Sequence, residues 1–113
     1  MRPVREQYRQ GDVLIMAVDG LPTDRAAVSR DQGRVVLAEG EVTGHAHAIL
    51  DRDAVLYEGD GDERFLEVSS PVTITHEEHD TIDLPPGLYQ VIRQREYTPK
   101  PSNRDARWRY VAD

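Results

Sequence analysis

Apolar and polar side chains alternate along much of this chain with a period of two, and glycine or proline interrupts the pattern often. Successive side chains of a β-strand point to opposite faces of a sheet, so this period predicts short strands with one buried face. A helical turn or two fits only residues 24–30, which lack a convincing apolar stripe. The expected strands fall at residues 12–18, 34–38, 45–50, 54–57, 64–68, 71–75, 82–84, 88–97 and 108–111.

Many short strands with frequent turns in a chain of 113 residues predict an all-β fold. The expected architecture is a small antiparallel β-barrel or sandwich. No internal repeat or domain boundary is visible, so residues 1–113 should form one domain. Within it, residues 98–107 are rich in proline and polar side chains and should form a loop before the last strand.

Composition narrows the chemistry that is open to this domain. Lys and Arg number 14 against 21 Asp and Glu, and the net charge of −7 disfavours non-specific attraction to nucleic acid. Cysteine is absent, so a metal would have to be held by nitrogen and oxygen. The sequence has no apolar run long enough to cross a bilayer and no signal-peptide pattern, so we expect a cytoplasmic protein without a membrane partner.

All four histidines lie in two short clusters, H-A-H at His45 and His47 and H-E-E-H at His76 and His79. Residues i and i+2 of a strand share a face, so His45 and His47 should point the same way with Cα atoms about 7 Å apart. That spacing lets two imidazoles converge on one ion. The H-E-E-H segment does not have the helical spacing of the zinc-protease motif H-E-x-x-H.

His76 continues the alternation of Val72 and Ile74, so its ring is expected to point inward, where an imidazole needs a hydrogen bond or a metal. His79 follows in a turn and is placed to fold back onto the same ion. Imidazole is a common ligand of transition metals. We therefore expect one divalent transition metal (Zn, Fe, Mn or Ni), with the ligands His45, His47, His76 and His79.

Carboxylates beside the clusters can complete the coordination sphere or orient an imidazole from outside it. Glu77 lies between the later histidines, and the expected outer carboxylates are Glu58, Glu78 and Asp80. Four histidine ligands would make a closed structural site, whereas three would leave a position for a reactive water. A metal-free cluster acting as acid and base, and histidines that are merely exposed, remain open alternatives.

The long strand expected at residues 88–97 suggests a second hypothesis. It carries Arg93, Arg95 and Tyr97 on one face, a composition that other β-surfaces use to hold single-stranded nucleic acid. The alternative function is therefore a non-catalytic interaction module that contacts RNA, single-stranded DNA or a larger assembly. The same side chains also stabilise strands by stacking and ion pairing, and the negative charge counts against nucleic acid. Homo-oligomerisation stays open.

Three segments resemble a family of small, largely uncharacterised prokaryotic and phage-borne β proteins. They are Q-G-D-V-L-I at 10–15, L-A-E-G-E-V-T-G-H-A-H-A-I at 37–49 and H-E-E-H-D-T-I-D-L-P-P-G-L-Y-Q-V-I-R-Q-R-E-Y at 76–97. The resemblance covers most of the chain and both histidine clusters. It implies that the histidines belong to one architecture, and it implies no particular activity.

A weaker likeness is to cupins, small β-barrels in which G…H-x-H, a later Glu and a later His hold one metal. The positions that match this pattern are Gly40, His45, His47, Glu58, Gly59 and His76. The gap from Gly40 to His45 is one residue shorter than in the usual motif, and Pro86 follows the later histidines instead of preceding them. The likeness therefore implies a cupin-like architecture only.

Overall fold

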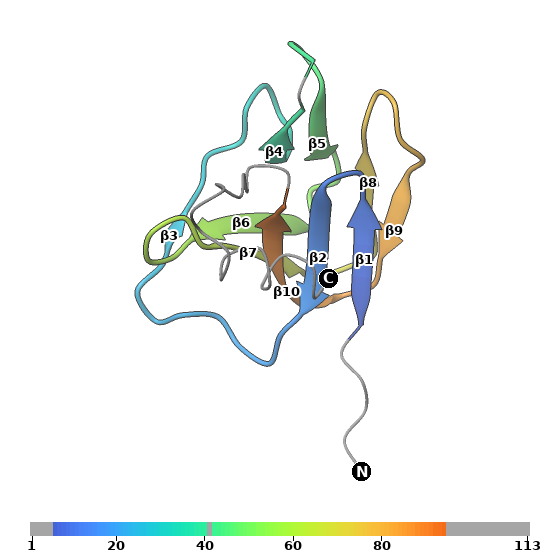
Figure 1. The fold of residues 1–113 in the computed structure, drawn as a ribbon. Helices are drawn as coiled ribbons and strands as arrows, with labels where there is room; N and C mark the ends of the chain where they lie inside the picture. Colours follow the sequence, from blue (N-terminus) through green and yellow to red (C-terminus); the bar gives the residue numbers. More distant parts are fainter. Residues whose placement is uncertain (1–5, 41, 95–113) are drawn as a thin grey trace, which may run out of the picture.

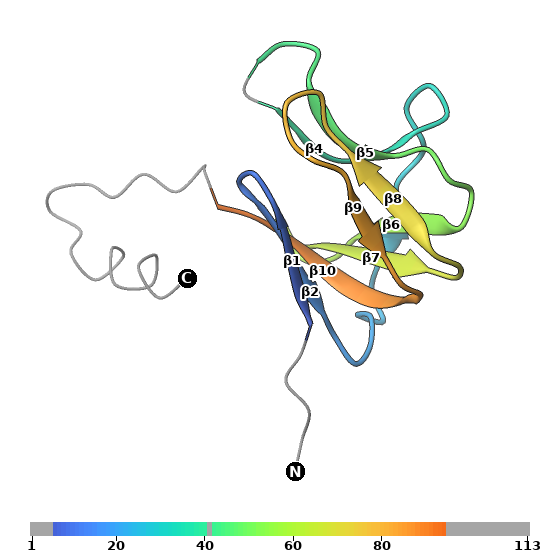
Figure 2. The same cartoon turned by 90° about the vertical axis from the view of Figure 1, so that its right-hand side faces the viewer.

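The computed structural model describes residues 6–40 and 42–94, which form two antiparallel β-sheets facing each other (Figures 1 and 2). Ten strands and no helix occur in these residues. Consequently, no helix in this part of the chain is long and apolar enough to span a membrane.

The larger sheet has six strands in the order β1-β2-β10-β7-β6-β3. Its central strand β10 is hydrogen-bonded on both sides, with Tyr89 opposite Ala17 of β2 and opposite Leu66 of β7. The bounds of the six strands, in sheet order, are β1 (Gln7–Gln10), β2 (Val13–Ala17), β10 (Gly87–Arg93), β7 (Arg64–Val68), β6 (Ala54–Glu58) and β3 (Ala26–Ala27).

The smaller sheet has four strands in the order β4-β5-β8-β9. These are β4 (Val35–Glu39), β5 (Ala46–Ile49), β8 (Val72–Thr75) and β9 (Ile82–Leu84). The pairing of β4 with β5 shifts register between Val36 and Ala38. This bulge interrupts the alternation of side chains, so Leu37 and Ala38 are both buried although they are neighbours.

The apolar core lies between the sheets and is built by the inward half of the alternating pattern. Ile15 of β2 and Leu66 of β7 face Ile49 of β5 and Ile74 of β8, and all four side chains are 0% exposed. Full burial of such side chains stabilises the fold by about 1.5–3 kcal/mol each. Truncation costs more, because a cavity is left behind.

The all-β prediction is confirmed, and the two sheets form a sandwich-like globule; the described strands do not close into a barrel. Residues 7–10 form the edge strand β1, which the hydrophobic pattern did not predict because most of its residues are polar. Residues 26–27 pair with β6 as the short strand β3, within the segment 24–30 that alone had room for a helical turn and lacked an apolar stripe. The expected loop at 98–107 and strand at 108–111 lie outside the described residues.

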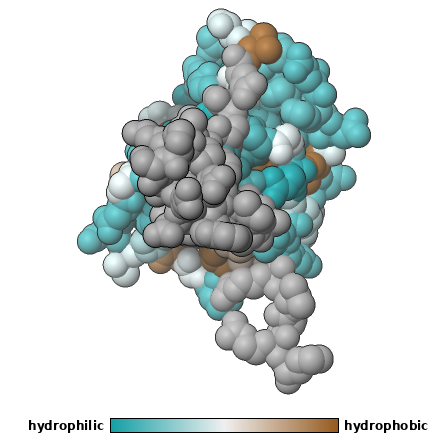
Figure 3. Space-filling view, viewed as in Figure 1, coloured by the Kyte–Doolittle hydropathy of each residue, from teal (hydrophilic) through white to brown (hydrophobic). Residues whose placement is uncertain are grey.

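The face seen in Figure 3 is mostly hydrophilic where the described residues form it, with small hydrophobic patches. The large apolar side chains exposed in residues 6–40 and 42–94 are Val42, Leu50 and Val55. They belong to the β4–β5 turn, the end of β5 and β6. Scattered residues of this kind are ordinary on protein surfaces and do not mark a binding face.

Candidate metal centre

The four histidines lie where the apolar core ends. In the pairing of β5 with β8, Ile49 is opposite Ile74, so two residues further along His47 comes opposite His76. Both rings therefore continue the inner face of the smaller sheet. The β1–β2, β4–β5 and β8–β9 turns lie at this end of the molecule (Figure 1).

The rings of the two clusters meet around His76. Its centroid lies 4.4 Å from that of His47, 4.5 Å from His79 and 5.8 Å from His45. The rings of His47 and His79 are stacked, with centroids 6.1 Å apart. The structure thus brings together two histidine pairs that are distant in the sequence. We call this group, His45, His47, His76 and His79, the histidine cluster.

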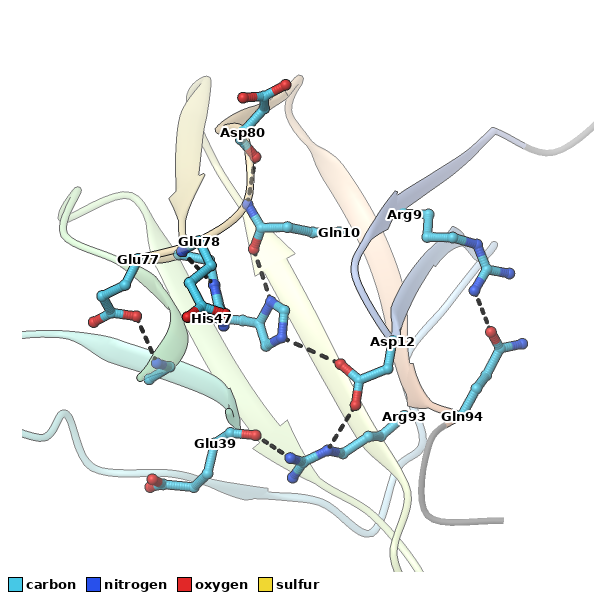
Figure 4. Close-up of polar contacts among 12 residues, drawn as sticks. Arg9, Gln10, Asp12, Glu39, His47, Glu77, Glu78, Asp80, Arg93 and Gln94 are labelled. Atoms are coloured by element: carbon cyan, nitrogen blue, oxygen red, sulfur yellow. Dashed lines mark hydrogen bonds and ion pairs between the residues drawn. The ribbon is translucent and has the colours of Figure 1, made fainter. Parts of the chain in front are cut away.

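Three ligand atoms in the histidine cluster and its border are close enough to share one ion. One atom each from His45, His76 and Glu77 lie within 4.8 Å of one another. The Ala46 N–H donates to Glu77 Oε1 at 3.0 Å and fixes the carboxylate beside β5 (Figure 4). This hydrogen bond is the main cause that lowers the Glu77 pKa, and the nearby histidines add to it. The carboxylate is therefore ionised and suited to a cation.

His45 offers an available ring nitrogen. Its Nδ1 is buried and has no hydrogen-bond partner among the residues that the structure describes. Glu78 Oε2 lies 3.7 Å away, which is too far for a hydrogen bond. A buried polar nitrogen without a partner costs stability, and a bound cation would relieve that cost.

His47 is the most buried of the four, with 1% of its surface exposed. Its Nδ1 lies 2.8 Å from Gln10 Oε1, and its Nε2 lies 3.4 Å from Asp12 Oδ1 (Figure 4). Burial lowers the His47 pKa from 6.5 to about 4; His76 contributes to the shift, and Asp12 opposes it. The ring is thus neutral at neutral pH.

Two glycines make room for the histidines. A Cβ atom on Gly11 would lie 2.6 Å from His79 Nε2, and Gly11 has a φ of 59° in the left-handed region. A Cβ atom on Gly40 would lie 2.8 Å from the Cβ of His45. Only glycine meets both demands at position 11 without strain. The backbone therefore approaches the histidine cluster from two sides.

The loop after β8 positions His76. The Glu78 N–H donates to His76 Nδ1 at 3.0 Å and fixes the ring against the loop. Residues 77–80 are exposed. Hydrogen bonds from Ala46 to Glu77 and from Gln10 to the Asp80 carbonyl hold the loop on either side, so a local rotation at Glu78 between them would be enough to release the ring.

The expected outer carboxylates fall in three different places. Glu78 lies beside His45, as described above. Asp80 has an exposed side chain and contributes its backbone carbonyl, which accepts a hydrogen bond from Gln10. The structure does not bring Glu58 to the histidine cluster, because it lies on β6 with its carboxylate 3.6 Å from the Arg64 guanidinium. Pairing along β6 and β7 sets that contact, which a linear motif does not reveal.

Two polar residues beside the histidine cluster, Gln10 and Asp12, and the glycine between them were not among the site residues predicted from the sequence. Gln10 ends β1, and Gly11 and Asp12 form the β1–β2 turn. Their neighbours in the site are far away in the chain. In the sequence these three residues open the Q-G-D-V-L-I segment of the family resemblance, as a polar and glycine-containing tripeptide directly before an apolar strand. Such a tripeptide is a common turn sequence and indicates no site.

Of the proposed nucleic-acid face, only Arg93 lies within the described residues; Arg95 and Tyr97 lie outside them. The Arg93 guanidinium donates to the Glu39 carbonyl, and its Nε lies 3.6 Å from Asp12 Oδ2 (Figure 4). It is therefore engaged inside the molecule. Arg93 also lines an open cavity of about 900 Å³. The other ionisable residues of that cavity are mostly acidic: Asp31, Glu39, Glu58, Asp62, Glu63 and Arg64.

Comparison with known proteins gives one result. The model of a family described as "Domain of unknown function (DUF8820)" matches residues 9–94. No curated protein and no solved structure matches the chain. The matched span contains the histidine cluster, the β1–β2 turn and Glu77. The family model covers most of the sequence, so this chain belongs to the DUF8820 family of domains of unknown function.

Proposed function

We propose that this domain binds a divalent transition metal ion through His45, His76 and Glu77. The observation that supports this most directly is that ligand atoms from these three residues lie within 4.8 Å of one another. They come from two segments that are distant in the sequence. Two imidazoles and an ionised carboxylate form a ligand set that suits zinc and its neighbours in the transition series.

The environment of these residues also favours a cation. The buried Nδ1 of His45 has no hydrogen-bond partner in the described part of the chain. Glu78 adds a second carboxylate beside it. Asp12 adds a third at the other side of the histidine cluster. These negative groups would attract a cation into the site.

Metal binding requires one rearrangement. His76 Nδ1 accepts the Glu78 N–H, so Nε2 carries the proton of the neutral ring. A metal at Nδ1 would replace this hydrogen bond, and a metal at Nε2 would move the proton to Nδ1. In both cases the bond to Glu78 is released, which the exposed loop at 77–80 allows.

The fourth ligand decides what the metal does. The His79 ring is 4.5 Å from that of His76 and is the nearest candidate. With His79 bound, the site is closed and the ion stabilises the fold. Without it, a bound ion would keep a position open and would supply Lewis-acid chemistry there, so hydrolysis would be the expected reaction. The cytoplasm remains the expected location.

The interaction-module alternative has less support. Arg93 is engaged with Asp12 and Glu39, and the cavity beside it is mostly acidic. The net charge of −7 opposes binding to phosphate backbones. Arg95 and Tyr97 keep their place in that hypothesis as sequence-based predictions.

The test is a Zn²⁺ titration of chelator-treated protein, with the wild type compared with Glu77→Gln. The substitution keeps the size of the side chain and removes its charge. We expect it to weaken the affinity of this site at least about 100-fold, since loss of an outer partner alone costs 10–100-fold. The matched control is Glu63→Gln, the same change on an exposed turn. Equal affinities in wild type and Glu77→Gln would contradict the proposal.

A further inference from the structure

The open cavity of about 900 Å³ lies between β4, at the edge of the smaller sheet, and β10 of the larger sheet. Both sheets give it an apolar lining, with Val36 from β4 and Val91 and Ile92 from β10. Val28, just before β4, adds to it. A concave surface with such a lining is suited to binding an apolar group. None of the proposed metal ligands lines it.

The two arginines of this cavity already have partners. Arg64 Nη1 donates to the Leu37 carbonyl at 2.9 Å, and its Nη2 lies 3.6 Å from the Glu58 carboxylate. Arg93 donates to the Glu39 carbonyl (Figure 4). Both cations therefore hold their positions against carbonyls of β4. They leave other carboxylates of the cavity without a counter-charge.

Four exposed carboxylates surround the apolar lining, and we call them the rim carboxylates: Asp31, Glu39, Asp62 and Glu63. Their side chains make no hydrogen bond or ion pair with any residue in the part of the chain that the structure describes. An apolar surface bordered by negative charge fits a ligand that combines aromatic side chains with cationic ones.

This chain carries such a segment itself. Residues 107–110 read R-W-R-Y, and residues 95–113 contain five Lys or Arg against three Asp or Glu, whereas the whole chain has a net charge of −7. The segment follows Arg93, which lines the cavity, and Gln94, the last described residue. The 12 residues between Gln94 and Arg107 can span up to about 40 Å, which is enough to reach any part of a cavity that begins at Arg93.

We infer that the cavity is a docking site for residues 107–110 of this chain. Alternate side chains of an extended segment point to opposite sides, so Trp108 and Tyr110 contact the apolar lining together. Arg107 and Arg109 then face the rim carboxylates. Each exposed ion pair is weak, but the tether supplies the segment at an effective concentration on the order of millimolar. The inference does not depend on the proposed metal site.

The first experiment locates Trp108, which is the single tryptophan of a chain without cysteine. A nitroxide label on Ser29→Cys, an exposed position in the cavity, should broaden the indole N–H resonance of Trp108 and remove most of its intensity. The control is Ser70→Cys, on the exposed turn at the far end of β7, where the label should leave most of the intensity. Equal intensities with the two labels would overturn the inference.

The same label tests whether the docked segment belongs to the same molecule. In a mixture of spin-labelled, isotopically unlabelled chain and ¹⁵N-labelled chain without a nitroxide, the Trp108 resonance should keep its intensity. Broadening in that mixture would overturn the inference, because the cavity would then hold the segment of a second copy.

The second experiment tests the role of charge with Asp62→Lys in the full chain. Reversing one rim carboxylate should lower the ratio of docked to undocked segment roughly 2–5-fold, the effect of one exposed ion pair. The readouts are recovery of the Trp108 resonance in the Ser29-labelled chain and a red shift of tryptophan fluorescence. Asp53→Lys, the same change on an exposed turn that does not line the cavity, should alter neither.

Two results of the second experiment would contradict docking at this cavity. Equal responses in Asp62→Lys and Asp53→Lys, including no response in either, would show that the rim carboxylates do not attract the segment. A wild-type Trp108 that acrylamide quenches as readily as in the urea-unfolded chain would show that the indole does not pack against the apolar lining.

Discussion

The two ends of the sandwich interior use the same two strands in different ways. At one end β5 and β8 place Ile49 opposite Ile74. Just beyond the end of β8, the ring of His76 lies beside that of His47, with centroids 4.4 Å apart. The isoleucines are fully buried and stabilise the fold by removing apolar surface from water. The histidines occupy equivalent inward positions but need hydrogen bonds or ions. One sheet face thus supplies both a core and a site.

The residues that set the stability of the fold are therefore different from those that would set metal affinity. Apolar burial requires no partner of a particular geometry, whereas His47 depends on Gln10 and Asp12 for its orientation. Changes at the isoleucine end should therefore act on the free energy of unfolding. Changes at the histidine end should act mainly on metal affinity.

The largest expected effect on stability is at Ile74. Ile74→Ala should lower the free energy of unfolding by about 2–5 kcal/mol, because the side chain is completely buried and a cavity would remain. His76→Ala, two residues along the same face, should cost far less stability but abolish binding at the proposed metal site. Urea unfolding and Zn²⁺ titration of both variants measure this. Similar losses of stability in the two variants would remove the distinction between the ends.

Lowering the pH should destabilise the histidine end next most strongly. Folded His47 has a pKa near 4, against 6.5 for its ordinary value, so between these values the unfolded chain binds more protons. Stability is therefore lost as the pH falls from 6.5 to about 4, by an amount on the order of 3 kcal/mol. Urea unfolding of chelator-treated protein across this range would measure the loss.

The matched variant for the pH experiment is His47→Gln, which has no titrating ring. Its stability should fall less steeply between pH 6.5 and 4, although Glu77 adds a loss of its own in the acidic part of the range because its pKa is lowered. The difference between the two curves isolates the contribution of His47. Parallel curves for wild type and His47→Gln would show that burial does not hold this ring neutral.

Much of the fold and the position of His76 could be predicted from the sequence. The features that were not predicted, β1 and the role of Gln10, share one physical cause. Alternation was enough to predict β8 and the inward direction of His76, since both follow from local geometry. It could not reveal β1, whose residues Gln7–Gln10 are polar along an edge strand. The role of Gln10 depends on carbonyls 64 and 70 positions away. Pairing of distant segments decides such contacts, and a local pattern does not contain it.

A smaller effect is expected at Gly11. There the cost of a left-handed backbone conformation can be measured separately from the effect on metal affinity. Gly11→Ala should cost about 1–2 kcal/mol from the left-handed backbone. Its Cβ would also displace His79, because it would lie 2.6 Å from Nε2. Gly61 has a φ of 60°, and a Cβ atom there would meet no described atom within 4 Å, so Gly61→Ala has the same strain alone. Titration with Zn²⁺ should show weaker binding only in Gly11→Ala; equal affinities would exclude His79 as a ligand.

The smallest effect should be a gain in stability far from the histidine cluster. The turn between Asp31 and Arg34 has positive φ at both central residues, 54° at Gln32 and 81° at Gly33. Asn tolerates this conformation better than Gln and favours such two-residue turns when it precedes glycine. Gln32→Asn should therefore raise the free energy of unfolding by about 0.5 kcal/mol.

The metal affinity of Gln32→Asn tests how independent the histidine end is. A rigid site should keep its Zn²⁺ affinity unchanged, because its ligands make no contact with this turn and the free energy gained is shared by the metal-free and metal-bound folded states. If affinity instead rises with stability, part of the site must be unfolded before the ion binds. Binding energy would then be spent on ordering the loop at 77–80, and the two ends of the interior would be thermodynamically coupled.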